Sequence, residues 1–321
     1  MTEYRDRLRL ALLAGGDSPE REVSLSSGAQ VAESLDPDRY DVRRYDPRTD
    51  LGDLVRDAGE IDAALLILHG PNGEDGTIQG LLDLLGIPYQ GSGVLGSAMA
   101  MNKKVARERC EQAGLPAPSW RELRSDDPAE LARIMDRIGI PLVVKPAACG
   151  SSIGMSIVRK AEDLPAAARL ALSHDNCVLA EAYISGAEIT AGVMGNEEME
   201  ALPPIEIIPG AGHEFFDYNA KYVPGATEEI CPARIPDDLT RKVQEYALRA
   251  HRALELTGYS RSDFILSDGE FYLLETNTIP GMTATSLFPQ AAAAAGYGFS
   301  ALLDHLIELG MDARRRKIST S

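Results

Sequence analysis

Short apolar runs alternate with amphipathic segments along the whole chain. The runs at 8–13 and 61–68 are apolar apart from Arg9 and Asp62 near their starts, which is typical of strands buried on both faces of a sheet. Residues 240–256 have the apolar spacing of a helix that covers a sheet. Further strands are predicted at 141–145, 177–184 and 205–208, and further helices at 78–85, 97–113, 127–138 and 300–309. Strands and helices in this alternation predict an α/β fold.

The segment 259–289 contains the most informative departure from this pattern. Two short apolar strands flank a Ser-Asp-Gly turn and run into a loop with proline and glycine. Apolar strands usually have their charges at the ends, yet Arg261, Asp263, Glu275 and Asn277 lie inside these strands or at their edges. Residues two apart share a face of a strand. Arg261 and Asp263 are therefore expected on one face, and so are Glu275 and Asn277.

The turn between the strands decides whether the two pairs meet. A three-residue loop 267–269 with a left-handed Gly269 places Arg261 opposite Glu275, with Asp263 diagonal to it. A two-residue Asp-Gly turn instead sends the two pairs to opposite faces of the hairpin. We predict the three-residue register.

Three oxygen-bearing side chains on one rigid face suit a hard cation. Magnesium prefers octahedral oxygen ligands, few of them from protein, with water and phosphate supplying the rest. The neighbouring arginine is suited to hold a phosphate or a developing oxyanion. A structural ion-pair cluster on a half-solvated sheet explains the hairpin equally well. The rest of the chain has to decide between these two interpretations.

Two glycine-rich loops follow the predicted strands of the N-terminal part. Gly15 and Gly16 precede a helix start that contains Glu20, and His69 and Glu74 lie in the polar loop after the second strand. A strand, a glycine loop and a helix form a turn of ligand-binding type, although neither loop contains the dinucleotide motif GxGxxG. Two plain alternatives stay open. Acidic residues at a helix start complement the helix dipole, and a lone histidine at a strand end is usually an ordinary loop residue.

Buried charges and small-residue loops continue through the centre of the chain. Lys145 ends an apolar strand, where a phosphate would explain it, and Glu181 interrupts another and so needs a partner. That partner is an adenine amino group, ribose hydroxyls or neighbouring lysines. The loop 149–154 suits the covering of phosphates but is no Walker motif, and an ordinary hairpin loop fits as well. The irregular segment 210–233 has the length of a lid or binding loop, and the glycine-rich segment 91–96 is predicted to be a hinge.

Composition and charge narrow the class of protein. At 321 residues the chain exceeds one ordinary core, so two or three domains are expected. The formal net charge of −17 argues against nucleic acid or an anionic membrane as main partner, whereas a nucleotide needs only one local basic pocket. Four cysteines without a CxxC pair are typical of a reduced, cytoplasmic protein without a zinc site. No apolar run reaches membrane-spanning length, and the N-terminus lacks the apolar core of a signal peptide.

Five motifs, in order and at matching spacing, resemble those of the ATP-grasp superfamily and, within it, the D-alanine–D-alanine ligase family. They are GGDSPEREVSL, HGPNGEDGTIQG, VKPAACGSSIGMS, DYNAKY and LLETNTIPGMTATSLFP, and the match extends over residues 10–310. The resemblance implies three domains, at 1–100, 101–188 and 189–321, with ATP held between the sheets of the second and the third. It also implies a reaction. Two D-alanines are joined through a D-alanyl phosphate, with release of ADP and phosphate, for peptidoglycan precursor synthesis.

The resemblance also implies roles for individual residues around ATP. Asp263, Glu275 and Asn277 would bind two magnesium ions, for which manganese can substitute. Arg261 would stabilise the acyl phosphate and the tetrahedral oxyanion. The residues that would contact the phosphates, adenine and ribose of ATP are Lys103, Lys145, Ser152, Glu181, Ile184 and Glu188.

A second group of residues is implied for the two amino acids. The residues that the resemblance assigns to the D-alanines and to the oxyanion hole are Glu20, Ser151, Tyr222, His69, Lys221, Ser286 and Gly281. Glu20 would accept the ammonium of the first D-alanine, with Ser151 and Tyr222 hydrogen-bonded to it through closed loops. Lys221 and Ser286 would hold the carboxylate of the second D-alanine.

The chain departs from the family's pattern at three positions. Cys149, Ala182 and Thr285 stand where the family often has an acidic residue, a lysine and a histidine. The first two bear on loop closure and adenine contact, and none touches the metal ligands. Tyr222 favours D-alanine over D-lactate as second substrate, and the family suggests a homodimer. Two alternatives remain, namely another ATP-grasp carboxylate–amine ligase and a non-catalytic nucleotide-binding protein, which the complete metal-binding set argues against.

Overall fold

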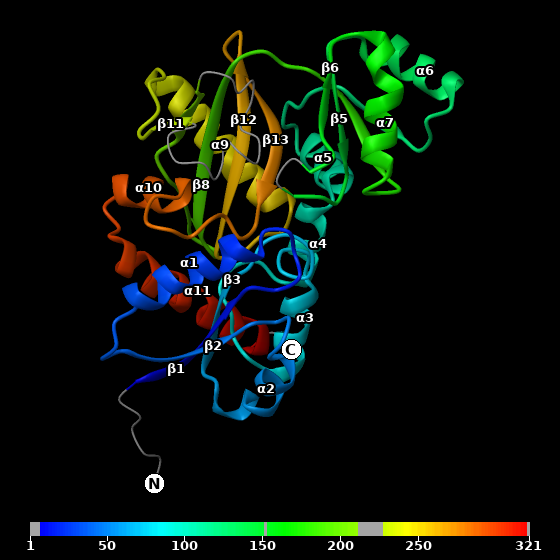
Figure 1. Cartoon of the computed structure of the whole chain (residues 1–321). Helices are drawn as coiled ribbons and strands as arrows, with labels where there is room; N and C mark the ends of the chain where they lie inside the picture. The colour runs from blue at the N-terminus through cyan, green and yellow to red at the C-terminus, as the bar shows by residue number, and fades with distance from the viewer. Residues whose placement is uncertain (1–6, 151–152, 211–226, 320–321) are drawn as a thin grey trace.

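Within residues 7–150, 153–210 and 227–319, which the computed structural model describes, the strands form three sheets. One sheet comes from the N-terminal part, one from the central part and one from the C-terminal part of the chain. Figure 1 shows the N-terminal sheet at the bottom of the molecule and the other two sheets above it. The mixed helix and sheet architecture that the apolar pattern predicts is confirmed.

The N-terminal sheet is small and parallel. Its strands, in spatial order, are β2 (Tyr40–Tyr45), β1 (Leu8–Ala14) and β3 (Ala63–Ile67). The helices of this part are α1 (Arg21–Ser34), α2 (Leu51–Arg56), α3 (Thr77–Leu85) and α4 (Val94–Met101), with a 3₁₀ turn at Ala58–Glu60. Helix α1 lies unusually close to β1 because Gly28 has no side chain. A Cβ atom at that position would lie 2.5 Å from the Cβ of Ala14.

The central sheet is antiparallel and has its own apolar core. Its strands, in spatial order, are β4 (Trp120–Leu123), β7 (Val178–Ala182), β5 (Leu142–Pro146) and β6 (Ser156–Val158). Helices α6 (Pro128–Ile138) and α7 (Leu164–Leu172) pack on it, and a 3₁₀ turn (Ala161–Asp163) precedes α7. Helix α6 begins as the sequence suggests, because the Asp127 side chain accepts a hydrogen bond of 2.8 Å from the Ala129 N–H.

The C-terminal sheet is the largest of the three. Its strands, in spatial order, are β11 (Thr227–Ile230), β10 (Ile205–Pro209), β8 (Ala187–Gly195), β12 (Tyr259–Ser267) and β13 (Glu270–Asn277), with β9 (Met199–Ala201) paired to β8. Helices α5 (Lys103–Gln112) and α9 (Asp237–Ala253) pack on one face, over Phe264 and Phe271. The opposite face carries the polar side chains discussed below.

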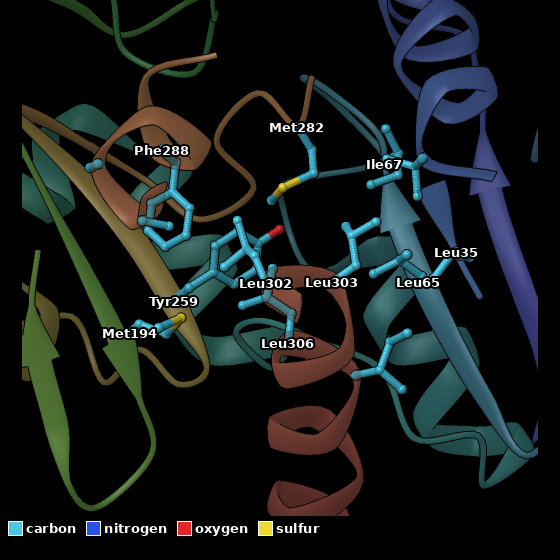
Figure 2. Close-up of a cluster of buried hydrophobic side chains, with 14 of the residues drawn as sticks. Leu35, Leu65, Ile67, Met194, Tyr259, Met282, Phe288, Leu302, Leu303 and Leu306 are labelled. Carbon is cyan, nitrogen blue, oxygen red and sulfur yellow. The ribbon is translucent and has the colours of Figure 1, made fainter. Parts of the chain in front are cut away.

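The last helix ties the N-terminal sheet to the C-terminal sheet. Helix α11 (Phe299–Ser319) follows α10 (Leu287–Ala294) and returns to pack against α1 and β3. Figure 2 shows its Leu302, Leu303 and Leu306 between Leu65 of β3 and Tyr259 of β12. Although α11 has 21 residues, neither it nor any other helix of the described residues is long and apolar enough to cross a bilayer.

One prediction about the segment 91–113 was wrong. The helix expected at 97–113 is two helices, α4 and α5, because Asn102 adopts an extended conformation between them and caps α5 by accepting a hydrogen bond of 3.1 Å from the Val105 N–H. The predicted hinge overlaps α4. Gly96 lies inside that helix, where a Cβ atom would be 2.9 Å from the Glu255 carbonyl oxygen, so glycine serves close packing there.

The register of the β12–β13 hairpin also differs from the prediction. The turn has two residues, Asp268 and Gly269, both left-handed with φ of 50° and 78°, which is the hairpin geometry that an Asp-Gly pair favours. This turn alone would separate the two polar pairs. A β-bulge next to Asp263 prevents that outcome, because it inserts Leu274 as an extra residue in β13.

Beyond the bulge the polar residues pair directly across the ladder. Asp263 lies opposite Glu275, and Arg261 lies opposite Asn277. Directly opposed residues of antiparallel strands share a face. The predicted three-residue loop and the predicted pairing of Arg261 with Glu275 were therefore wrong, and the convergence of the four side chains is produced by a bulge.

The close approach of α1 to β1 predicts a stability difference between two glycine substitutions. We expect Gly28→Ala to lower the free energy of unfolding by about 1–3 kcal/mol through overpacking against Ala14. Gly52 in α2 has no atom within 4 Å of a Cβ built there, so Gly52→Ala is expected to raise stability by about 0.5 kcal/mol. Urea denaturation measures both. Equal effects of the two substitutions would show that the α1–β1 packing relaxes freely.

Candidate active site

Two adjoining cavities contain the predicted site residues. The N-terminal cavity, of about 300 Å³, lies between the loops of the N-terminal sheet and the ends of β12 and β13. The inter-sheet cavity, of about 140 Å³, lies between the central and C-terminal sheets. Lys103 and Glu275 line both cavities. A molecule that fills both therefore passes these two side chains.

The structure brings together every predicted site residue that it describes. The predicted residues that line the N-terminal cavity are Glu20, His69, Lys103, Arg261, Glu275, Asn277, Gly281 and Ser286. The inter-sheet cavity adds Lys145, Glu181, Ile184, Glu188 and Asp263. Ser151, Ser152, Lys221 and Tyr222 lie outside the described residues, so their roles stay predictions.

The Asp263 carboxylate is the centre of the polar face of the hairpin. Arg261 donates two hydrogen bonds to it, of 2.9 Å from Nε and 2.8 Å from an Nη atom. The Asn277 amide donates a third of 3.1 Å, and the Thr190 hydroxyl of β8 a fourth of 2.6 Å. Asp263 is only 5% exposed. Side chains from three strands thus hold one buried carboxylate in place. Thr190 was not identified from the sequence as one of its partners.

The polar face has a donor set that fits a hard divalent cation. Asp263 and Glu275 supply carboxylate oxygens from directly opposed positions, and Asn277 would add an amide oxygen by turning its carbonyl towards the ion. No group of three or more His, Cys, Asp or Glu of metal-binding geometry occurs in the part of the chain that the structure describes. A site with two carboxylates and one amide leaves the remaining coordination positions to water and phosphate. Magnesium is usually bound in proteins in this way.

Lys103 connects the polar face to the loop that follows β5. Its Nζ lies 3.4 Å from a Glu275 carboxylate oxygen and donates a hydrogen bond of 2.6 Å to the Cys149 carbonyl. Its backbone N–H bonds the Ala147 carbonyl at 2.8 Å. The first residues of α5 therefore hold the start of the predicted phosphate-covering loop beside Glu275.

A buried charge cluster closes the inner end of the inter-sheet cavity. Glu181 of β7 forms ion pairs of 2.8 Å with both Arg107 of α5 and Lys145 of β5. Burial raises the pKa of Glu181, but Arg107 and Lys145 outweigh it, so the pKa lies below its ordinary value. Burial lowers the pKa of Lys145 in spite of Glu181. Lysine was one of the partners considered for Glu181, whereas Arg107 was missed.

Arg107 had a weak signal in the sequence. It lies four residues after Lys103, on the helix face that carries Ala106 and Cys110, which are buried in the core. An arginine beside the apolar stripe of an amphipathic helix is most simply explained as a solvated neighbour of that stripe. In the folded protein Arg107 is only 3% exposed. Its guanidinium forms an ion pair with Glu181 of β7 and a hydrogen bond to the Leu273 carbonyl of β13, and only the positions of these two strands reveal this.

Acidic residues and a neutral histidine form the N-terminal end of the site. Glu20 is buried, and Gly70 and Gly150 lie next to it, since a Cβ at either position would be 3.5 Å from a Glu20 carboxylate oxygen. Burial lowers the pKa of His69 although Glu20 opposes the shift, which favours the neutral imidazole. Its Nε2 has no hydrogen-bond partner among the described residues, so this atom is available to a ligand in the cavity.

The opposite end of the N-terminal cavity is built from hydroxyl groups and a carboxylate. The Ser286 hydroxyl accepts a hydrogen bond of 3.1 Å from the Thr283 N–H and lies 2.7 Å from the Thr283 hydroxyl. Gln290 of α10 donates to Glu229 of β11 and, at 2.6 Å, to the Thr285 carbonyl. Glu229 was not singled out by the sequence. Burial raises its pKa, against the effects of Gln290 and Arg261.

Comparisons with known proteins agree with this geometry. Residues 110–308 match a family model described as D-ala D-ala ligase C-terminus, and residues 48–92 match one described as D-ala D-ala ligase N-terminus. The chain is 59% identical to a D-alanine–D-alanine ligase of Syntrophobacter fumaroxidans, over 96% of this chain and 99% of that protein.

Solved structures show the same likeness in three dimensions. The D-alanine–D-alanine ligase of Bacillus anthracis has a TM-score of 0.86 and 38% identity, covering 97% of this chain and 99% of that one. The same enzyme complexed with ATP has a TM-score of 0.83 and 35% identity, with the same coverage.

Glu74 at the N-terminal cavity predicts a pH-dependent effect on stability. Burial, helped by Glu20 and Glu275, raises its pKa from 4.5 to about 8, against a hydrogen bond from the Gly70 N–H. Between these values the folded protein holds a proton that the unfolded chain has lost. The contribution of Glu74 to stability therefore falls as pH rises through this range. Glu74→Gln lacks this penalty, so its stability relative to the parent protein should increase from about pH 5 to about pH 8.

Urea denaturation of both proteins across this pH range measures the difference. Glu33→Gln, at an exposed position of α1, is the matched control and should show no such trend. A constant difference between the Glu74→Gln variant and the parent protein would contradict the raised pKa.

Proposed function

The chain belongs to the D-alanine–D-alanine ligase family, and from this membership we propose how its own residues carry out the family's reaction. It is an ATP-dependent ligase of the ATP-grasp type that joins two D-alanines into D-alanyl-D-alanine, with release of ADP and phosphate. This dipeptide is used in peptidoglycan precursors. A ligase for other amino acids is not favoured, because the relatives that match nearly the whole chain carry the D-alanine–D-alanine ligase name.

One observation carries the assignment of roles. Asp263, Glu275, Asn277 and Arg261 share one face of the hairpin at the junction of the two cavities. Phosphoryl transfer needs positioning and charge neutralisation rather than a covalent residue. A face with two carboxylates, an amide and an arginine provides both, between a cavity suited to a nucleotide and a cavity suited to amino acids.

The inter-sheet cavity is the proposed ATP site. Glu181 and the backbone near Ile184 would meet the adenine, and Glu188 the ribose hydroxyls. Lys103, Lys145 and Ser152 would contact the phosphates. Magnesium, held by Asp263, Glu275 and Asn277, would neutralise charge on the terminal phosphates when bound. The support is that seven of the described residues in this set line the inter-sheet cavity and that two of them, Lys103 and Glu275, also line the N-terminal cavity.

The N-terminal cavity is the proposed site of the first D-alanine. Its ammonium would face the buried Glu20 carboxylate and its carboxylate would point towards the γ-phosphate, past Lys103. The neutral His69 would offer its free Nε2 to the substrate. Attack of the substrate carboxylate on the γ-phosphorus forms the acyl phosphate and breaks the bond to the bridging oxygen of ADP.

The second D-alanine then attacks the acyl phosphate. Lys221 and Ser286 would hold its carboxylate, so that its amine attacks the acyl carbon. The Gly281 N–H and Arg261 would stabilise the oxyanion of the tetrahedral intermediate, which collapses with loss of phosphate. Ser151 and Tyr222 would hydrogen-bond to Glu20 from the loops above, and these loops would exclude water from the acyl phosphate. Tyr222 is proposed to favour an amine over D-lactate as second substrate.

Two further features belong to the proposal. Domain boundaries near residues 100 and 188 are supported by the ranges of the three sheets, although α11 returns to the N-terminal sheet.

We also infer a homodimer, supported by the family and by the exposed apolar side chains of Leu84, Val94 and Leu95 on the neighbouring helices α3 and α4. Sedimentation velocity tests the assembly, and a monomer at micromolar concentration would contradict it.

The metal assignment predicts the behaviour of an Asp263→Asn variant. The amide keeps the size of the side chain but removes the charge from the proposed metal site. We expect ADP release with D-alanine and ATP to fall by about 100- to 1000-fold, while near-ultraviolet circular dichroism reports a native fold. Coupled spectrophotometric detection of ADP measures the rate.

Asp268→Asn is the matched control on the same hairpin. Asp268 lies exposed at the turn, in a left-handed conformation that asparagine also adopts, so this variant should keep full activity. Full activity in the Asp263→Asn variant would remove the metal assignment. Faster ADP release with L-amino acids than with D-alanine in the parent protein would instead contradict the substrate.

A further inference from the structure

The bulge in β13 creates a local problem that the hairpin cannot solve alone. Leu274 and Glu275 are consecutive, yet both side chains line the inter-sheet cavity. The regular alternation of the strand is therefore interrupted between them. Strand β13 is also the edge strand of its sheet, so its backbone groups that point away from β12 have no ladder partner, and the extra residue of the bulge adds to them. Unpaired backbone groups in the interior cost stability comparable to a lost hydrogen bond. The register of the proposed metal ligands depends on something outside the hairpin that satisfies these groups.

Arg107 of α5 binds the backbone at the bulge. One Nη atom donates a hydrogen bond of 2.6 Å to the Leu273 carbonyl, and the other lies 3.3 Å from the Leu274 carbonyl. The Leu273 N–H is bound at 2.9 Å by the Pro116 carbonyl, in the connection after α5. The polar backbone groups around the extra residue thus point to α5 and the loop that follows it.

The same guanidinium also reaches the other wall of the nucleotide site. The Nη atom near Leu274 donates at 2.8 Å to Glu181 Oε1, while Lys145 binds Oε2 at 2.8 Å. Arg107 and Glu181 are 3% and 2% exposed. A buried carboxylate between two cations has a fixed orientation. The Arg107 side chain therefore orients the Glu181 carboxylate on the central sheet and binds the backbone of the bulge on the C-terminal sheet.

We propose that Arg107 is a positioning residue that links the two walls of the nucleotide site: through Leu273 and Leu274 it holds the register that faces Glu275 towards Asp263, and through Glu181 it orients the adenine side. The inference rests on the proposed function, because it takes the two walls to be the nucleotide and metal sites. Arg107 itself lines neither of the two cavities described above. It acts through the residues that do.

The geometry requires arginine rather than a cation in general. A guanidinium presents several N–H donors in a planar fork, so it binds two carbonyls and a carboxylate together. A lysine ammonium at this position would keep the charge next to Glu181 but lose the fork. Arg107→Lys therefore separates the two roles, since the ion pair with Glu181 survives while the support of the bulge weakens.

Calorimetric titration with ADP, in the presence and absence of magnesium, tests the proposal without turnover. In the Arg107→Lys variant we expect binding of ADP with magnesium to weaken about tenfold, as for other residues that orient metal ligands. ADP binding without magnesium should change much less, and the D-alanine concentration for half-maximal ADP release should stay constant. Arg109→Lys, at an exposed position of the same helix that pairs with Glu255, is the matched control and should match the parent protein.

Each outcome of this experiment decides something. Unchanged ADP affinity with magnesium would overturn the role of Arg107, and so would an equal loss with and without magnesium or an equal loss in the Arg109→Lys control. Failure of the parent protein to bind ADP or to release it with D-alanine would contradict the proposed function instead. If the lysine variant does not fold, Arg107→Gln is measured in its place. Its amide still donates to one carbonyl but loses the ion pair with Glu181, so ADP affinity should fall without magnesium and fall further with magnesium.

Discussion

The register between β12 and β13 is the constraint on which the candidate active site depends. A two-residue turn and a strict ladder would face Asp263 towards Leu274 and turn Glu275 to the other side of the sheet. One inserted residue reverses that outcome for every position beyond it. The bulge thus converts a short hairpin with a favourable Asp-Gly turn into a platform with two carboxylates, an amide and an arginine on one face.

Buried and half-buried ion pairs connect the polar face of the hairpin to helix α5, and α5 in turn to the central sheet. Isolated charges in the interior are costly, so each one must have a partner of opposite sign. Asp263 has Arg261, Glu275 has Lys103, and Glu181 has Arg107 and Lys145. These pairs cross between strands, helix α5 and both upper sheets. A polyphosphate entering between them would find cations already oriented, and the carboxylates prevent those cations from repelling one another before it arrives.

The N-terminal sheet contributes its loops only because α11 holds it in place. This helix follows the hairpin by more than 20 residues in the sequence, yet its leucines pack between β3 and Tyr259 of β12 (Figure 2). Apolar packing of this kind is dense and tolerates little displacement. Glu20 and His69, which follow β1 and β3, are thereby positioned across the N-terminal cavity from Arg261 and Ser286.

The sequence by itself determined the α/β class, the position of most strands and helices, and which polar residues stand in apolar strands, because these follow from local periodicity and residue chemistry. Only the tertiary structure decided the bulge at Leu274, since 271–274 is apolar throughout and shows no alternation that a shift would break. The partners of Glu181 and the break at Asn102 were also beyond it. They depend on contacts between segments far apart in the chain, which no local pattern encodes.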